Sequence, residues 1–140
     1  MDSEHSTGDL VMALARRVRR EHADSLAEWD VTPSQGRALR VLSSRPEGMR
    51  PSALADELRI APRSATDVVD ALTARGWVVR TPDPTDRRAT VLTLTADGRD
   101  LADRIEGVRR QASERVLDVL TAAQRRTLHE ILTVVVGEHQ

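Results

Sequence analysis

The chain has 140 residues, 39% of them hydrophobic, which is in the usual range for one domain with a modest core and leaves little room for a second independent domain. It contains no cysteine, so disulfides, thiolate metal sites and thiol-based peroxide sensing are excluded. The formal net charge of −1 at pH 7 at first argues against binding to nucleic acid. However, residues 33–90 hold ten arginines against seven acidic residues, whereas the flanking segments are acidic, so positive charge is concentrated in the middle of the chain.

The first predicted element is an amphipathic helix from Asp9 to about Leu26. Its apolar residues recur with helical spacing on one stripe, and the arginines between them lie mostly on other faces. The stripe consists of Leu10, Leu14 and Val18, joined more loosely by Val11 and Ala15. So small a chain must bury this stripe against its own helices or against a second copy, and we expect an interlocked dimer.

Two short helices joined by a tight turn are predicted in the middle of the chain. Before them, Thr32 and Gln35 have the spacing of a capping box, with proline at the first helical position, which predicts a helix through Leu42. After a Pro-Glu-Gly turn, helices are expected over residues 51–58 and 62–75. This pair has the arrangement of a helix-turn-helix.

The period of the sequence changes after Gly76 and predicts a β-hairpin. Apolar and β-branched residues form two expected strands, at 77–80 and 90–94, around the turn-rich segment 82–86. A hairpin that follows the second helix of a helix-turn-helix is a wing.

Two more helices are predicted after the hairpin. Thr95 is a suitable N-cap for a long helix, and Thr121 begins a capping box that opens the last helix. The predicted fold is mainly α with a small β-hairpin wing, a winged helix-turn-helix flanked by long N- and C-terminal helices. We expect residues 1–32 and 96–140 to supply dimerisation helices and residues 33–95 to form the DNA-binding domain.

The first turns of the helix over 62–75 supply candidate contacts to DNA. The residues predicted to face outward there include Arg63, Ser64, Thr66 and Asp67. An α-helix fits the major groove, where Arg63 can pair with guanine and Ser64 or Thr66 can contact a phosphate or a thymine methyl. Asp67 either repels phosphate or accepts a hydrogen bond from a cytosine amino group. The alternative is that all four are ordinary solvated residues of a first helical turn.

Two arginines occupy the tip of the predicted hairpin. Arg87 and Arg88 can reach the adjacent minor groove, where narrow AT-rich tracts concentrate negative potential. Asp86 is expected to orient one guanidinium through a charge-assisted hydrogen bond. An Asp-Arg-Arg triplet alone is usually a solvated loop, but its place between two strands directly after a helix-turn-helix favours contact with DNA.

The sequence lacks the patterns of an enzyme or a metal site. It has no nucleophile elbow, glycine-rich phosphate loop or His-Glu metal motif, and the four histidines show no metal-ligand spacing. They are His5, His22, His129 and His139. We therefore expect no catalysis, cofactor or metal. No apolar stretch is long enough for a membrane span, and the start of the chain has no signal-peptide pattern, which predicts a cytoplasmic protein.

The run from Leu72 to Arg88, with residues 92–98 behind it, resembles the MarR family of bacterial transcription regulators. It places the end of a recognition helix, a turn, a charged wing tip and a return strand in one continuous segment. The resemblance implies a homodimer that binds double-stranded DNA at a pseudo-palindromic operator. Members are commonly repressors released by small aromatic or anionic molecules bound between the dimer helices and the DNA-binding lobe. The DNA contacts that it implies are Arg63, Ser64, Thr66, Arg87 and Arg88.

Trp29 is the candidate ligand-binding residue. It lies near the junction of the first two predicted helices, where a small-molecule effector can change the separation or tilt of two recognition helices. The alternative is a tryptophan of the core or of an interface. The chain has no Phe or Tyr, and Trp29 and Trp77 are its only aromatic residues. In this respect it departs from the family's pattern, and we do not expect an effector pocket lined with aromatic rings.

The functional prediction is a sequence-specific transcription regulator. One helix-turn-helix makes few contacts with DNA, whereas a twofold dimer covers two half-sites about 34 Å apart. The alternative functions are a winged-helix module for protein–protein interaction and a regulator without a small-molecule effector. Salt-dependent binding to DNA distinguishes a regulator from an interaction module.

Overall fold

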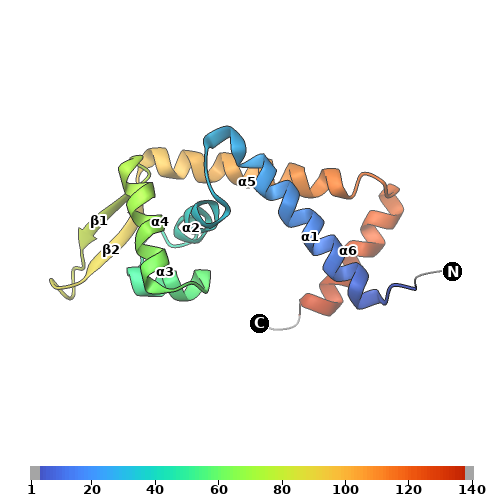
Figure 1. Ribbon diagram of the computed structural model, residues 1–140, viewed down its shortest axis with the longest axis horizontal. Coiled ribbons are helices and arrows are strands. Elements are labelled where there is room, and N and C mark those ends of the chain that lie inside the picture. The colour runs from blue at the N-terminus through green and yellow to red at the C-terminus, as the bar shows by residue number, and fades with distance from the viewer. Residues whose placement is uncertain (1–3, 138–140) are drawn as a thin grey trace.

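The computed structural model describes residues 4–137, so His139 lies outside the described residues. The elements, in chain order, are α1 (Thr7–Ser25), a 3-10 turn η1 (Ala27–Trp29), α2 (Pro33–Ser43), α3 (Pro51–Leu58), α4 (Pro62–Ala74), β1 (Val78–Pro82), β2 (Thr90–Leu94), α5 (Ala96–Val116) and α6 (Ala122–Val136). A mainly α chain with a hairpin wing between flanking helices is therefore confirmed (Figure 1).

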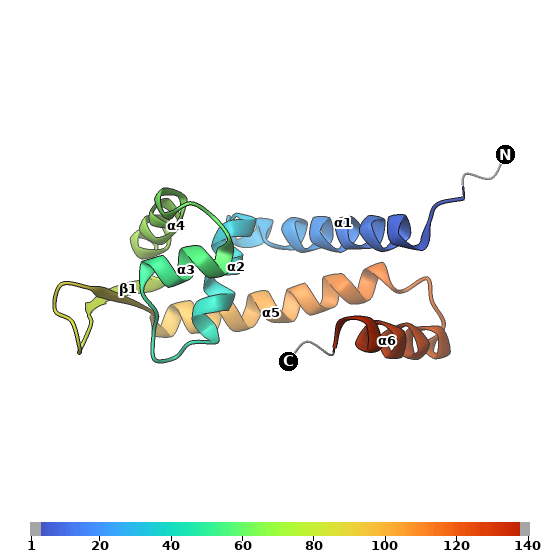
Figure 2. The ribbon, with the colours of Figure 1, turned by 90° about the horizontal axis from the view of Figure 1, so that it is seen from below.

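The molecule has a head and two arms. The head contains α2, α3, α4 and the hairpin of β1 and β2, and the arms are α1 and α6. The long helix α5 runs from the head along α1 and connects to α6 (Figure 1). The arms overlap in Figure 1, but Figure 2 shows α1 and α6 on opposite sides of α5. Neither arm contributes a buried residue, so within residues 4–137 each arm has a face that the other elements leave exposed.

Side-chain caps set the helix starts. The two predicted capping boxes form in full, pairing Thr32 with Gln35 and Thr121 with Gln124. The Thr95 hydroxyl accepts from the Gly98 N–H at 3.0 Å and begins α5. A further capping box of Ser6 and Asp9 begins α1 at Thr7, two residues before the predicted start, because these side chains satisfy backbone N–H groups that the helix leaves unpaired.

The hydrophobic core lies in the head. Its fully buried large side chains come from α2, α3, α4 and β2, and are Leu39, Leu42, Leu54, Leu58, Val69, Leu72 and Leu92. Burial of each such side chain contributes about 1.5–3 kcal/mol relative to exposure, which fixes α4 against the other helices.

Among residues 4–137, no helix combines the length and the apolarity needed to cross a bilayer.

The wing is joined to the head at its base. In the antiparallel hairpin, Val78 lies opposite Leu94, and β1 begins and ends later than predicted. Met49 forms an isolated bridge with Leu92. Gly48, just before it, has φ of 88°, and a Cβ there would lie only 2.3 Å from Cγ1 of Val91. Only glycine fits where the chain passes so close to the sheet.

Candidate nucleic-acid interface

The turn between α3 and α4 has a defined geometry. Helix α3 ends at Leu58, and Arg59 then takes the left-handed conformation with φ of 54°. The Ile60 N–H returns to the Ala55 carbonyl at 3.1 Å, a bond that is typical of helix C-termini. Helix α4 begins at Pro62 and buries one face in the core, so its opposite face points to solvent.

The exposed face of α4 carries the predicted base contacts. Arg63, Ser64, Thr66 and Asp67 are all exposed. The Thr66 hydroxyl donates to the Pro62 carbonyl at 3.0 Å, so towards DNA this hydroxyl can only accept a hydrogen bond. Within the described part of the chain, the Arg63 guanidinium has no hydrogen bond or ion pair, which leaves all its donors for an external partner.

A second acid on α4 is neutralised by the wing. Asp70 forms an ion pair with Arg80 of β1, which joins the recognition helix to the hairpin. The sequence alone did not indicate this pair. Of the charged residues on the outward face of α4, Arg63 and Asp67 remain, and their opposite charges cancel. The excess of positive charge near α4 therefore has to come from the wing tip.

Asp83 holds the base of the wing loop. Its Oδ1 accepts from both the backbone N–H and the hydroxyl of Thr85 at 2.8 Å, and its Oδ2 accepts from Nε and Nη2 of Arg50 at 3.0 and 2.9 Å. The hydrogen bonds from Thr85, followed by that from Arg50, lower the pKa of Asp83 from 3.8 to about 2. At neutral pH the carboxylate is ionised and ties the wing to the N-cap residue of α3.

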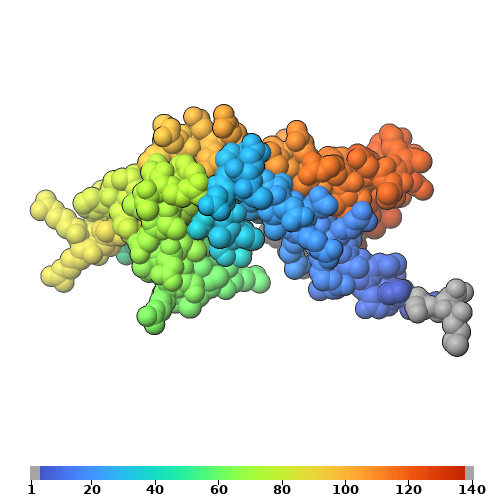
Figure 3. Space-filling view, turned by 45° about the horizontal axis from the view of Figure 1, so that its top comes forward, coloured from blue at the N-terminus to red at the C-terminus, as the bar shows by residue number. Residues whose placement is uncertain are grey.

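The tip of the wing presents two free arginines. Arg87 and Arg88 are exposed, and Figure 3 shows the hairpin as a fork that projects from the head. Asp86 was expected to orient a guanidinium, but its Oδ1 accepts from the backbone N–H of Arg88 at 3.0 Å. The expectation is corrected because a carboxylate two residues before an amide forms a local turn more readily than it reaches a long side chain.

Arg75 joins the recognition helix to the connection between α1 and α2. Its guanidinium donates to the carbonyls of Trp29 and Asp30, each at 2.7 Å. The central carbon of this guanidinium, Cζ, lies 3.9 Å from the centre of the Trp77 ring. The Trp29 ring is half-buried and packs against the core. Trp29 thus lies at the joint between arm and head.

A cavity of about 500 Å³ lies between α1, α2 and α5. Its apolar wall includes Leu26 and Ile105. The charged and titratable side chains that line it are Arg19, Arg20, His22, Arg37, Arg40 and Arg109. Among the described residues no Asp or Glu lines this cavity, which we call the arginine cavity. Trp29 does not line this cavity, and its ring packs against the core, so its role as a ligand contact stays a prediction.

The arginine cavity perturbs its own cations. Burial, followed by the charge of Arg40, lowers the pKa of Arg109, and Glu106 opposes this shift. Burial, followed by the charges of Arg109 and Arg40, likewise lowers the pKa of His22. Because like charges repel at short range, an anion placed among these cations would reduce the repulsion between them.

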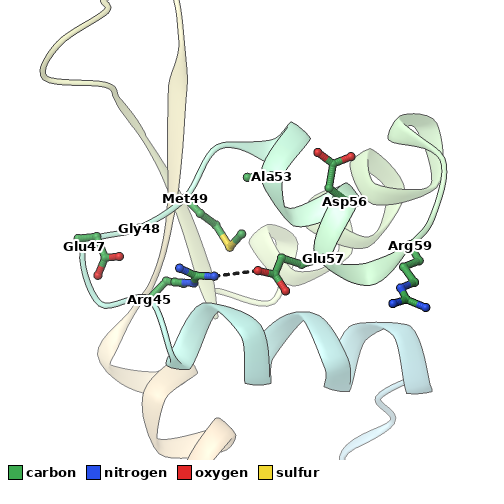
Figure 4. Close-up of a pocket in the computed structure, with 8 residues that line it drawn as sticks. All are labelled: Arg45, Glu47, Gly48, Met49, Ala53, Asp56, Glu57 and Arg59. Atoms are coloured by element: carbon green, nitrogen blue, oxygen red, sulfur yellow. Dashed lines mark hydrogen bonds and ion pairs between the residues drawn. The ribbon is translucent and has the colours of Figure 1, made fainter. Parts of the chain in front are cut away.

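A second hollow on the head differs in charge. It lies between the end of α2 and α3, and Figure 4 shows Arg45 crossing it to an ion pair with Glu57 at 2.7 Å. Glu47 and Asp56 also line it, together with Arg59. Acidic side chains and arginines line this groove together, so it provides no concentration of positive charge for an anion.

Helices α3 and α4, followed by the arginine-tipped hairpin, form a winged helix-turn-helix. This architecture places its second helix, here α4, in the major groove of DNA. Residues 29–89 match the MarR family. Over 125 residues the chain is 34% identical to the HTH-type transcriptional repressor Rv2887 of Mycobacterium tuberculosis, and the match covers 89% of each chain. The chain belongs to the MarR family. It is a DNA-binding transcription regulator and not an enzyme.

Solved structures agree with this assignment. Rv2887 in complex with salicylic acid is 32% identical, with a TM-score of 0.76, and the match covers 96% of this chain and 99% of that one. Wild-type MarR from E. coli, in its apo form, has a TM-score of 0.89 over 96% of this chain and 99% of its own. Its identity of 24% makes it a comparison of fold alone.

Proposed function

We propose that the protein is a cytoplasmic repressor that binds a pseudo-palindromic operator as a homodimer and releases it when a small organic anion occupies the arginine cavity. The observation that carries the DNA-binding part is the exposed Arg63 on α4 beside the exposed Arg87 and Arg88 on the wing. In the described structure these guanidiniums have no protein partner. Their free donors suit guanine edges and backbone phosphates.

Exposed apolar side chains on the arms support the homodimer. Six of the most exposed are Leu10, Val11 and Met12 on α1 and Ile131, Val134 and Val135 on α6, which are 50–75% exposed. Within residues 4–137, neither α1 nor α6 contributes a buried residue. Contiguous apolar surface of this kind marks an interface. We assign dimerisation to segments 1–32 and 96–140 and DNA binding to segment 33–95.

The charge of the arginine cavity supports an anionic effector. Its walls combine apolar carbon from Leu26 and Ile105 with guanidinium groups, and this suits a molecule with an apolar body and a carboxylate. The related protein Rv2887 was solved in complex with salicylic acid, so salicylate is a reasonable probe for this chain.

Selection of bound fragments from random double-stranded DNA, followed by fluorescence anisotropy over a salt series, tests the DNA-binding part. We expect an inverted repeat with half-site centres about one helical turn apart. Arg88→Ala should lower the slope of log affinity against log salt by about one unit. Arg63→Ala should weaken binding by about 1–3 kcal/mol and relax preference at one base pair.

Arg104→Ala is the matched control. Arg104 is an exposed arginine on α5 and has no hydrogen bond or ion pair with the described residues, so its removal should leave affinity and salt slope close to those of the wild type. Equal behaviour of the three variants would mean that α4 and the wing do not contact DNA. Absence of binding at low ionic strength would contradict the DNA-binding proposal altogether.

A further inference from the structure

Arg37 connects the arginine cavity to the helix-turn-helix. Its side chain forms part of the cavity wall on α2, while its Nη2 donates to the carbonyl oxygen of Leu58 at 2.5 Å. Leu58 is the last residue of α3. Among the described residues that line the cavity, Arg37 is the arginine whose guanidinium bonds to an element outside the cavity wall. A ligand in the cavity and the end of α3 therefore share one side chain.

The Leu58 carbonyl needs such a partner. The last carbonyls of an α-helix have no N–H group of their own helix to pair with, and a cation at this end interacts favourably with the helix dipole. Immediately after Leu58, the chain takes the left-handed conformation at Arg59 and enters α4 at Pro62. The hydrogen bond from Arg37 thus holds the turn that sets the direction of the recognition helix.

An anion in the cavity would compete for this guanidinium. A carboxylate accepts a stronger hydrogen bond from a guanidinium than a neutral carbonyl does. The long, flexible side chain of arginine lets the charged group move without movement of α2. Arg37 would then leave the Leu58 carbonyl, and the α3–α4 turn would lose its contact with the cavity wall.

We propose that Arg37 is the positioning residue that transmits anion binding in the arginine cavity to the recognition helix, by exchanging the Leu58 carbonyl for the anion. This rests on the proposed function, because it assumes that an effector acts at this cavity. A second observation makes the inference specific to Arg37: Arg40 lines the same cavity from the same helix but has no hydrogen bond to α3 within the described residues.

Arg37→Gln and Arg40→Gln form a matched pair for the test, since each removes one guanidinium from the cavity wall of α2. The probe is salicylate, with the neutral salicylamide as its control. Two quantities are measured: operator affinity with and without saturating probe, and amide hydrogen exchange at Arg59 and Ile60. Arg37→Lys serves as the conservative variant, because a lysine can still donate one charged hydrogen bond to the carbonyl.

In the wild type, salicylate should weaken operator binding by about tenfold, a typical size for coupling between two sites, and should speed exchange at both amides, whereas salicylamide should do neither. Arg40→Gln should bind salicylate more weakly but keep the full tenfold response at saturation. Arg37→Gln should reduce that response to about twofold or less and should exchange faster at Ile60 before any probe is added. Arg37→Lys should recover part of the response.

The outcomes separate the two proposals. A full salicylate response in Arg37→Gln overturns the role of Arg37 while the effector proposal stands. If salicylate leaves operator binding of the wild type unchanged, the effector proposal fails for this class of anion. Amide hydrogen exchange measured without probe then tests whether Arg37 holds the α3–α4 turn. Equal exchange at Arg59 and Ile60 in Arg37→Gln, Arg40→Gln and the wild type then shows that Arg37 does not hold the turn, which overturns the inference.

Discussion

The head and the arms bury apolar surface in different ways. In the head, Leu39 and Leu72 have no exposed surface, and the residues that cover them come from the same chain. In the arms, Val134 is 74% exposed and Val135 is 75% exposed. Since apolar burial is the main favourable contribution to folding, the head is stabilised by its own side chains, whereas the exposed apolar side chains of the arms would be buried only in the proposed dimer.

Besides the packing of Trp29 against the core, polar contacts connect the arm α1 to the rest of the molecule. Arg75 at the end of α4 bonds to the carbonyls of Trp29 and Asp30, and His22 on α1 lies within hydrogen-bond distance of Ser113 on α5, the helix that connects the head to α6. Hydrogen bonds of this kind can exchange partners without opening a packed core, whereas interdigitated apolar side chains resist small displacements. The comparison therefore teaches that a change in arm geometry can reach the head through a few polar contacts.

The largest effect is expected from a cavity in the head. Leu39→Ala should lower the free energy of unfolding by about 2–5 kcal/mol, because Leu39 is fully buried. Val79→Ala on β1, where the side chain is 40% exposed, should cost less than about 1 kcal/mol. Urea titration at one fixed protein concentration measures both, since the stability of a dimer depends on concentration. A loss of the same size in both variants would contradict a head with its own core.

The next effect concerns the arms. Val135→Asp places a charge on the apolar stripe of α6 and should convert a dimer into a monomer of 15.5 kDa. Operator affinity should fall by roughly 100-fold, because one half-site no longer adds to the binding of the other. Sedimentation and anisotropy measure the two changes.

Thr133→Asp is the control for the arm substitution. Thr133 is exposed on α6 and, by helical spacing, lies on the side opposite Val135. It adds the same charge to the same helix, so the dimer should persist. A dimer in both variants, or a monomer in both, would show that the apolar stripe of α6 is not the interface.

Leu39→Ala should destabilise the head equally in the Val135→Asp background, because distant sites act additively.

Local signals in the sequence were enough to predict most of the fold. The capping boxes at Thr32 and Thr121 involve residues only three positions apart, and both form as expected. Val69 and Leu72 have the apolar spacing of one helical face of α4, and both are buried in the core. Caps and periodicity depend on neighbours along the chain, which is why one sequence can reveal them.

Contacts between distant residues could not be predicted in the same way. Arg50 and Asp83 are separated by 33 positions, and Arg37 and Leu58 by 21, so no local pattern pairs them. Arg19 and Arg20 were expected mostly off the apolar stripe of the first helix, yet they line the arginine cavity, because α2 and α5 pack beside that part of α1. The cavity exists only once three helices are assembled.

The smallest effect is expected from His22, at the junction of arm and cavity. Its Nε2 lies 2.7 Å from the Ser113 hydroxyl. Burial, then the charges of Arg109 and Arg40, lowers its pKa from 6.5, although Glu106 opposes the shift. The unfolded chain therefore binds this proton more readily than the folded one, so His22 makes the protein less stable as pH falls through 6.5.

Ligand binding should have the opposite dependence on pH. An anion in the arginine cavity offsets the repulsion from Arg109 and Arg40 and favours protonated His22, so salicylate, which stays ionised, should bind with uptake of a proton. Its affinity should rise as pH falls from about 8 to about 6, by at most about tenfold per unit. Calorimetry in buffers of different ionisation enthalpy measures the uptake. His22→Asn should remove it, and an unchanged proton uptake in that variant would mean that a group other than His22 takes up the proton.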